Sequence, residues 1–235
     1  MPDRVTFLYI ASCFCLLCLF FPQTGLGEDR TLEQQLVRLQ NHYRHLNSLS
    51  FTFSQLTRTG LRTREGAGNA IFLRLQETGR PGIMRWNYTT PDPQVLLNDG
   101  EKLSIYSARD RQVIITSAAE LNNDITYAFF SGTRNPSEDF TVNAPEKRYG
   151  FALPGTELKA LRLIPREPHP QIRAVQIWFD SDLLIRRLVL EDHFDSITEL
   201  TFSNIKTNTL DPADPEQVKA ILRLDLPPDT EVITQ

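Results

Sequence analysis

Short segments in which apolar and polar residues alternate recur along most of this 235-residue chain. One of them places Met84, Trp86 and Tyr88 on one side of an extended backbone, and Arg85 and Asn87 on the other. Alternation of this kind is typical of a β-strand with one buried face and one wet face. About a dozen such segments, mostly joined by short polar turns, predict one antiparallel sheet that curls around its apolar face.

Glycine and aspartate mark the turns between these segments. Asp99-Gly100 lies between two alternating segments and is a strong hairpin signal. Gly66 and Gly68 open another segment and predict a bend or a close approach of the backbone. We expect strands from Leu49 onward and at 71–75, 83–89, 95–97, 103–107, 111–116, 148–153, 157–164, 172–179, 183–191, 196–205 and 220–226, with a long loop at 207–216.

Two amphipathic helices interrupt the strands. The first follows a capping box, Thr31 to Gln34, and its apolar stripe consists of Leu32, Leu36, Leu39, Tyr43 and Leu46. The second follows Ser117 and closes at Gly132, with a stripe of Ala118, Leu121, Ile125, Ala128 and Phe129. A barrel of about eight strands is filled by its own side chains. The larger number of strands expected here leaves space that must hold these helices, a ligand or both.

The N-terminus has a different composition from the rest of the chain. A nearly uncharged apolar run, Val5–Phe21, is followed by small residues at Gly25 and Gly27. This is the layout of a secretory signal peptide, so we expect residues 1–27 to be removed and residues 28–235 to form a single domain. An uncleaved membrane anchor is the alternative, because the run is close to the shortest membrane span. All three cysteines lie in this segment, so the mature chain has no disulfide or cysteine nucleophile.

Composition and motifs exclude several classes of function. The formal net charge is −4 and the pI is near 5.6, which gives no basic surface for nucleic acid. His193 lies between Asp192 and Asp195 in a tight turn, where aspartate is expected, and no other histidine or cysteine completes a ligand set. The sequence contains no nucleophile elbow, phosphate loop or His-Glu-x-x-His pair. We therefore expect neither an enzyme nor a metal or other cofactor.

The remaining functional candidate is the apolar surface itself. An ordinary hydrophobic core is the simplest interpretation of this surface. An oily ligand is the alternative, because the expected strands are too many for a barrel that is filled by its own side chains. The pattern of residues leaves both interpretations open.

A series of short motifs, taken in order, resembles the outer-membrane lipoprotein carriers of Gram-negative bacteria (LolA-like proteins). The resemblance covers nearly the whole mature chain. It rests on the helix Leu32–Leu46, Phe53-Ser54-Gln55, Gly66-Ala67-Gly68, Arg80-Pro81, Arg85-Trp86-Asn87-Tyr88, Pro91 with Asp99-Gly100, Leu161–Pro165, Thr198–Asn204 and Leu224–Ile233. The departures are an insertion at Gln76–Gly79, the absence of a glycine in the turn Asp192–Asp195, and Asp229 in place of a glycine.

The resemblance implies a mainly β fold with helices (α+β): an incomplete antiparallel β-barrel of about ten to twelve strands, with an amphipathic helical lid over an apolar cavity. It implies a periplasmic carrier, expected as a monomer, that binds lipoprotein acyl chains. The cargo would come from an inner-membrane ABC transporter and pass to an outer-membrane acceptor. We expect the cavity to be lined by Phe51, Phe53, Met84, Trp86, Tyr88, Leu96, Ile105, Leu121, Ile125, Phe129, Leu161 and Leu163, with Arg80 bonded to lid carbonyls.

Three related functions stay open. A LolB-like acceptor shares the fold but is itself a lipoprotein, and Cys13 is poorly placed for processing. A carrier on the same fold could move a free envelope lipid or a glycolipid. An envelope-stress sensor could recognise mislocalised lipoproteins without transporting them, and retention of Val5–Phe21 as an anchor would favour it.

Overall fold

The computed structural model describes residues 25–75, 82–132 and 135–235; of residues 25–30, 122 and 123 it describes the backbone only. Most of the expected signal segment 1–27 and the expected lid residue Arg80 lie outside these ranges. The elements in chain order are α1 (Gly25–Arg44), β1 (Ser48–Thr59), β2 (Arg62–Leu73), β3 (Ile83–Thr90), β4 (Gln94–Asn98), β5 (Lys102–Ser107), β6 (Gln112–Ser117), the 3₁₀ helix η1 (Ala118–Asn123), α2 (Ile125–Ser131), α3 (Pro136–Asp139), β7 (Phe140–Asn143), the 3₁₀ helix η2 (Lys147–Tyr149), β8 (Lys159–Pro165), β9 (Ala174–Phe179), β10 (Ile185–Glu191), β11 (Ile197–Thr207), α4 (Pro215–Leu222) and β12 (Glu231–Thr234).

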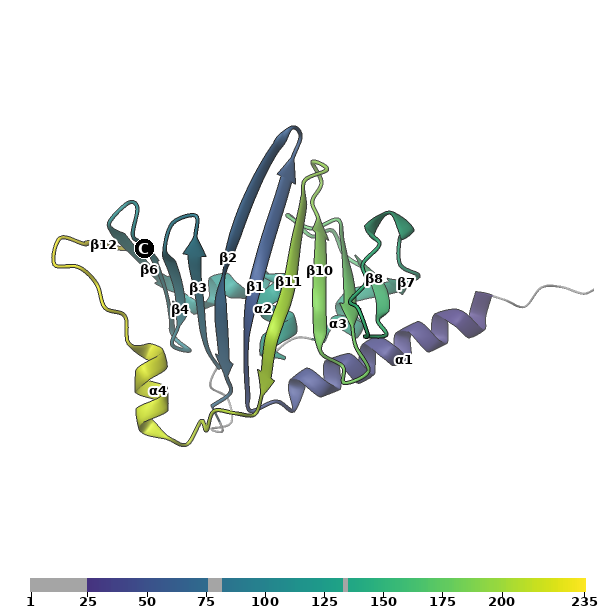
Figure 1. The fold of residues 1–235 in the computed structure, drawn as a ribbon, viewed down its shortest axis with the longest axis horizontal. Helices are drawn as coiled ribbons and strands as arrows, with labels where there is room; N and C mark the ends of the chain where they lie inside the picture. The colour runs from purple at the N-terminus through teal and green to yellow at the C-terminus, as the bar shows by residue number, and fades with distance from the viewer. Residues whose placement is uncertain (1–24, 76–81, 133–134) are drawn as a thin grey trace, which may run out of the picture.

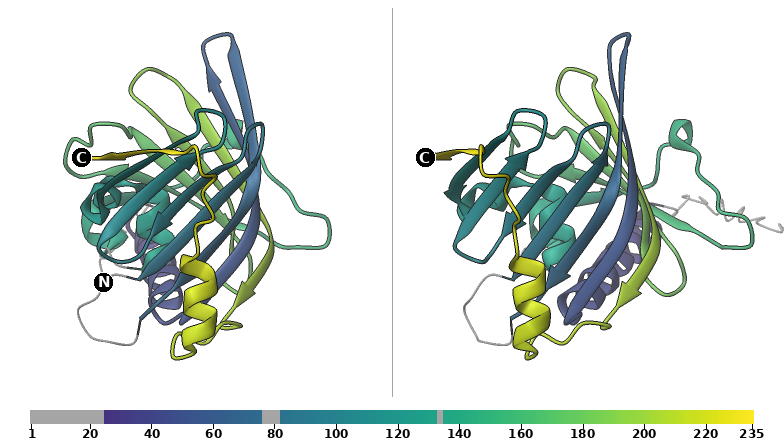
Figure 2. Two further views of the ribbon diagram at one scale, coloured as in Figure 1. Left: turned by 90° about the vertical axis from the view of Figure 1, so that its left-hand side faces the viewer. Right: turned by 60° about the vertical axis from the view of Figure 1, so that its left-hand side comes forward.

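All twelve strands belong to one open sheet, in the order β12-β6-β5-β4-β3-β2-β1-β11-β10-β9-β8-β7. Neighbouring strands pair antiparallel, except that β12 pairs with β6 in parallel. The sheet curves, and α2 lies on its concave side (Figures 1 and 2). The other large helix, α1, packs against α2, α3 and β7. The mainly β, unclosed fold with a helical cover is therefore confirmed.

The strand register places one set of side chains on the concave face. Trp86 lies opposite Leu96 on β4 and opposite Ala70 on β2, and Ala70 in turn lies opposite Phe51 on β1. Because side chains alternate between the faces of a strand, this register carries every second residue of these strands to the same side. The apolar face predicted from the alternation is thus continuous across the sheet.

The two glycines at the centre of β2 allow a close approach between strands. A Cβ atom at Gly68 would lie 1.8 Å from the backbone oxygen of Asn87 and 3.0 Å from the ring of Phe53. At Gly66 a Cβ atom would lie 3.3 Å from the ring of Tyr88. The predicted close backbone approach is confirmed, and it brings the aromatic rings of β1 and β3 together above β2.

The second predicted helix is divided into two. Its expected ends are correct, since the Ser117 side chain accepts from the Ala119 amide and Gly132 closes α2 in the left-handed conformation. Between them the chain leaves the helical conformation at Asp124, whose side chain caps α2 by accepting from the Tyr127 amide at 2.7 Å. Aspartate favours an N-cap over a helix interior, which accounts for the break.

Three predictions for other segments were wrong. Residues 220–226 were expected to be a strand, but the first three of them form the end of α4, Pro215–Leu222. This helix forms because Asp214 caps its N-terminus and Pro215 occupies its first position. The expected strand 148–153 forms the short η2 and an irregular segment. The first helix begins at Gly25 and passes through the expected cap at Thr31. Short apolar runs are ambiguous between helix and strand, and local capping decided the outcome here. The strands β7 and β12 were not predicted.

The convex face of β8–β11 carries a buried network of charges. Glu191 is only 1% exposed and accepts hydrogen bonds from Arg162 and Arg173, each at 3.1 Å. Burial alone would raise the pKa of Glu191, but the hydrogen bonds and positive charge of Arg162, together with Arg173, outweigh it and lower the pKa to about 2. Tyr149 and Phe151 pack beside this network against Trp178. These contacts hold the segment after β7 onto the sheet.

Replacing Glu191 with glutamine is expected to lower the free energy of unfolding by about 3 kcal/mol at pH 7, because it removes a buried carboxylate that Arg162 and Arg173 share and leaves the buried Arg162 with only the partly exposed Glu146. Since the pKa of Glu191 is lower in the folded chain, its contribution is complete above its ordinary pKa of 4.5 and is lost as the pH falls toward about 2. Urea unfolding of wild type and Glu191→Gln between pH 7 and pH 2.5 measures this effect, and the difference between the two proteins should shrink toward the acid end. Asp229→Asn is the control, since Asp229 pairs with Arg111 at the surface. A loss equal to that of the control would contradict the role given to Glu191.

Candidate ligand-binding cavity

Seven aromatic side chains meet on the concave face and form what we call the aromatic core. Its members are Phe51, Phe53, Phe72, Trp86, Tyr88, Phe130 and Phe202. The ring centroids of Phe53 and Trp86 are 4.4 Å apart, and Phe130 lies 4.8 Å from Phe51 and 5.0 Å from Phe202. Phe130 is the one member that α2 supplies, so this helix is inserted into the concave face rather than resting on it.

A cavity of about 290 Å³, which we call the apolar cavity, lies beside the aromatic core. The sheet lines it with Phe72, Met84, Trp86, Leu96, Leu190 and Leu200, and η1 and α2 add Leu121 and Tyr127. A few polar side chains share the lining: Gln55, Asp124, Thr126 and Thr198. An apolar wall with a small number of polar groups is the usual composition of a small-molecule site.

The structure places all twelve expected cavity residues in or against one hydrophobic core. The cluster contains Phe51, Phe53, Met84, Trp86, Leu121, Ile125, Phe129, Leu161 and Leu163, with Tyr88, Leu96 and Ile105 packed against it. Met84, Trp86, Tyr88, Leu96 and Leu121 line the apolar cavity itself. The other seven belong to the same hydrophobic core without lining the cavity. Their proximity is established, and their role as contacts for acyl chains stays a prediction.

Three polar groups in the apolar cavity, on Trp86, Tyr88 and Asp124, have unusual surroundings. Trp86 is buried, and its Nε1 has no hydrogen-bond partner of normal geometry among the described residues. Burial raises the pKa of the neighbouring Tyr88 hydroxyl, and the nearby indole N–H lowers it by less. Asp124 is exposed toward the open cavity, yet protein surrounds it closely enough for desolvation to raise its pKa against the hydrogen bonds of the Tyr127 and Thr126 amides. Unpaired hydrogen-bonding capacity therefore faces a mostly apolar space.

Sequence reasoning missed several residues of this region. Phe72 and Leu200 follow the alternation of strands that were predicted, and they could have been chosen by register with Met84 and Gln55. Phe130 follows Phe129 in the predicted helix but lay outside its expected stripe. In the structure α2 buries both Phe129 and Phe130, and Phe130 is the one that contacts Phe51 in the aromatic core.

Arg74, directly after β2, ties the covering helices to the sheet. Its Nη2 donates to the carbonyl oxygen of Ser131 at 2.9 Å and to that of Tyr43 at 3.3 Å. Ser131 ends α2, so the cation also lies at the negative end of that helix. Burial, followed by the charge of Arg44, lowers the pKa of Arg74. Arg80 lies outside the described residues, so its expected bond to lid carbonyls stays a prediction; Arg74 makes bonds of this kind.

A second polar contact holds α2 at its centre. Asn98, which is fully buried at the end of β4, donates from Nδ2 to the Tyr127 hydroxyl at 3.2 Å. Among the described residues, α2 also packs on the sheet through apolar side chains of the hydrophobic core. Arg74 and Asn98 therefore add directional contacts to a largely apolar cover.

The described residues offer little for other kinds of site. No group of three or more histidine, cysteine, aspartate or glutamate side chains in ranges 25–75, 82–132 and 135–235 could hold a metal ion. The Asp192 side chain accepts from the Phe194 and Ser196 amides, at 2.8 and 2.7 Å, so it serves the turn beside His193. Over the same residues, no helix has both the length and the apolar character needed to cross a membrane.

Comparison with known proteins agrees with this geometry. The family model described as outer membrane lipoprotein carrier protein LolA matches residues 44–214. An outer-membrane lipoprotein carrier protein of Dechloromonas aromatica is 26% identical over 205 residues, which cover 86% of this chain and 87% of that protein. The protein of the same name from Methylococcus capsulatus is 27% identical over 198 residues, covering 84% and 86%.

A solved structure shares the fold. The crystal structure of an uncharacterized conserved protein from Thermus thermophilus matches with a TM-score of 0.53 at 13% identity, over 87% of this chain and 99% of that chain. The match of the family model spans most of the sequence, from the end of α1 to the cap of α4. The chain therefore belongs to the LolA family of outer-membrane lipoprotein carrier proteins.

Proposed function

We propose that this protein is a periplasmic carrier that binds the acyl chains of lipoproteins on its concave face. In this proposal it receives cargo from an inner-membrane ABC transporter and delivers it to an outer-membrane acceptor, without enzymatic activity. The observation that carries the proposal is the apolar cavity beside the aromatic core, under a helix held by few polar contacts. Membership of the carrier family supports the same conclusion.

The energetics of the cargo require such a face. Each methylene group removed from water contributes about 0.8 kcal/mol, so free acyl chains do not cross an aqueous compartment unaided. An open sheet with one continuous apolar face offers these chains a surface, and its convex face carries ion pairs such as Arg162–Glu191 and Arg187–Glu199. Release then depends on a change in the cover rather than on chemistry.

The closed form is too small for several chains. Its apolar cavity of about 290 Å³ lies at the lower end of the range for ligand pockets, about 300–1,000 Å³. Phe130 packs against both Phe51 and Phe202, which also contact each other, and these rings fill the adjoining part of the concave face. We infer that α2 moves outward when cargo enters, which removes Phe130 and exposes the aromatic core to the acyl chains.

A charge placed in the apolar cavity is expected to prevent acyl-chain binding. Leu96 lines the cavity, whereas its neighbour Val95 lies on the opposite face of the same strand. Leu96→Glu should lower the lipid that copurifies at least about tenfold, because an unpaired carboxylate is costly in an apolar site. Val95→Glu should retain the lipid. Mass spectrometry of the full chain purified from a Gram-negative periplasm measures both.

The identity of the copurified molecule tests the proposal as a whole. Triacylated lipoprotein supports a lipoprotein carrier, and phospholipid or glycolipid alone would make the protein a carrier of free lipid. A protein that is empty in wild type, with Leu96→Glu and Val95→Glu equally folded by circular dichroism, would mean that the concave face is only a core.

Loss of the Arg74 contacts is expected to loosen α2. Arg74→Met removes charged hydrogen bonds to the Ser131 and Tyr43 carbonyls and keeps a long side chain, at a cost of about 1.5 kcal/mol. Amide hydrogen exchange in α2 should become about tenfold faster as a result. The matched control is Arg85→Met, because Arg85 donates in the same way to the Ile221 and Arg223 carbonyls of α4 and the residue after it. Exchange in α2 that changes no more than in the control would contradict this function of Arg74.

A further inference from the structure

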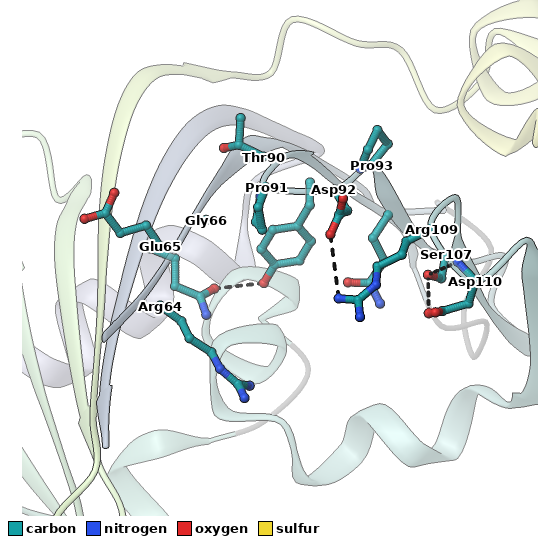
Figure 3. Close-up of a pocket in the computed structure, with 13 residues that line it drawn as sticks. Arg64, Glu65, Gly66, Thr90, Pro91, Asp92, Pro93, Ser107, Arg109 and Asp110 are labelled. Carbon is teal, nitrogen blue, oxygen red and sulfur yellow. Dashed lines mark hydrogen bonds and ion pairs between the residues drawn. The ribbon is translucent and has the colours of Figure 1, made fainter. Parts of the chain in front are cut away.

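A second and larger cavity adjoins the apolar cavity at one end of the sheet. This polar cleft, of about 790 Å³, lies between β2 and the turns that join β3 to β4 and β5 to β6, and its lining includes residues 64–66, 90–94, 107, 109 and 110 (Figure 3). Gln55 and Tyr88 line both the polar cleft and the apolar cavity. The two spaces are therefore neighbours that share one wall.

The shared wall is a single pair of side chains. The Tyr88 hydroxyl donates to Oε1 of Gln55 at 2.8 Å, and the Tyr88 ring packs over Gly66. Beside this pair, on the apolar side, lies the unpaired N–H of Trp86. An ester carbonyl at this boundary would find two donors, because it could replace Gln55 as acceptor from Tyr88 and satisfy Trp86.

The polar cleft presents both signs of charge, and one cation in it has no partner. Arg64 points into the cleft and makes no hydrogen bond or ion pair with any residue that the structure describes (Figure 3). Arg109 lies 3.9 Å from Asp92, and Asp110 accepts from the Ser107 hydroxyl at 2.7 Å. Asp92 and Asp110 thus have partners within the wall, and Arg64 keeps its full capacity to donate.

We propose that the polar cleft binds the polar end of an acylated ligand. The ligand's ester groups lie at the Tyr88–Gln55 pair, its acyl chains enter the apolar cavity, and its anionic or carbonyl-bearing group pairs with Arg64. The inference rests on the proposed function, which supplies the chains. The shared chemistry, an ester-bearing glycerol with an attached acceptor group, occurs both in a lipoprotein N-terminus and in a phospholipid.

Three probes with identical brominated acyl chains separate these contributions: a diacylglyceryl-cysteine peptide, a phosphatidylglycerol, and the methyl ester of the chain alone. Quenching of Trp86 emission in the full-length protein reports their binding, since Trp178 lies in the separate cluster on the convex face. Arg64→Gln should weaken binding of a probe with a polar end about tenfold, the equivalent of 1.4 kcal/mol, because a charged hydrogen bond is lost. Binding of the methyl ester should not change.

Arg62→Gln is the matched control, because Arg62 lies on the same hairpin but outside the cleft, and its substitution changes the net charge by the same amount. If Arg64→Gln weakens binding of the lipopeptide alone, the group at Arg64 is the peptide end of a lipoprotein. If it weakens binding of phosphatidylglycerol alone, that group is the phosphate. If it weakens binding of both probes, that group is the glycerol ester that they share. If the methyl ester binds and Arg64→Gln behaves like Arg62→Gln with every probe, the polar cleft is not a subsite and the proposed carrier function stands. If no probe quenches wild-type Trp86, the carrier function itself fails.

Discussion

A single sheet with one apolar face has to bury that face, and in this protein the insertion of Phe130 does so at the centre. The ring lies within about 5 Å of Phe51 and Phe202, and α2 carries it there from outside the sheet. Because most strands contribute to the same concave surface, the position of α2 decides how much of the surface is core and how much is available to a ligand. The same residues can serve both purposes at different times.

The position of α2 over the concave face depends on hydrogen bonds at its edges and on apolar contacts with the sheet below it. Arg74 joins the end of β2 to carbonyl groups of both α1 and α2, and Asn98 reaches the hydroxyl of Tyr127. Apolar contacts are exchangeable, since an acyl chain can replace a phenylalanine ring at little cost. The polar contacts therefore fix the position of α2 in the closed form, whereas the apolar surface beneath it can bind an acyl chain in place of the helix.

The convex side is built on a different principle. There the buried Glu191 accepts from Arg162 and Arg173, and Arg187 stacks over Trp178 while pairing with Glu199. These contacts join strands to each other and to the segment after β7, far from the concave face. A wall fixed on its outer side can lose its inner cover without losing its shape, which agrees with the outward movement of α2 that we propose.

Local sequence predicted most strands and the ends of the second helix, because alternation and capping act over a few residues. It failed where tertiary contacts select between local choices. The run 220–226 had the length of a strand, but the Asp214 cap and the packing of Ile221 on Leu73 and Ile83 made it part of α4. The alternation of Tyr149 and Phe151 predicted a strand, but both side chains pack onto Trp178 from outside the sheet.

The sequence by itself determined the antiparallel sheet, its apolar face and the side chains on that face, since these follow from a period of two and from turn residues. That the sheet is open was implied only by the resemblance to LolA-like proteins. The sequence also carried the resemblance that the family match confirmed. Only the tertiary structure decided that Arg74 ties the cover, that Phe130 fills the concave face and that Gln55 meets Tyr88 between two cavities. Each of these depends on residues brought together from different elements, and the distances that join them are set by the curvature of the sheet and by the break in the helix at Asp124.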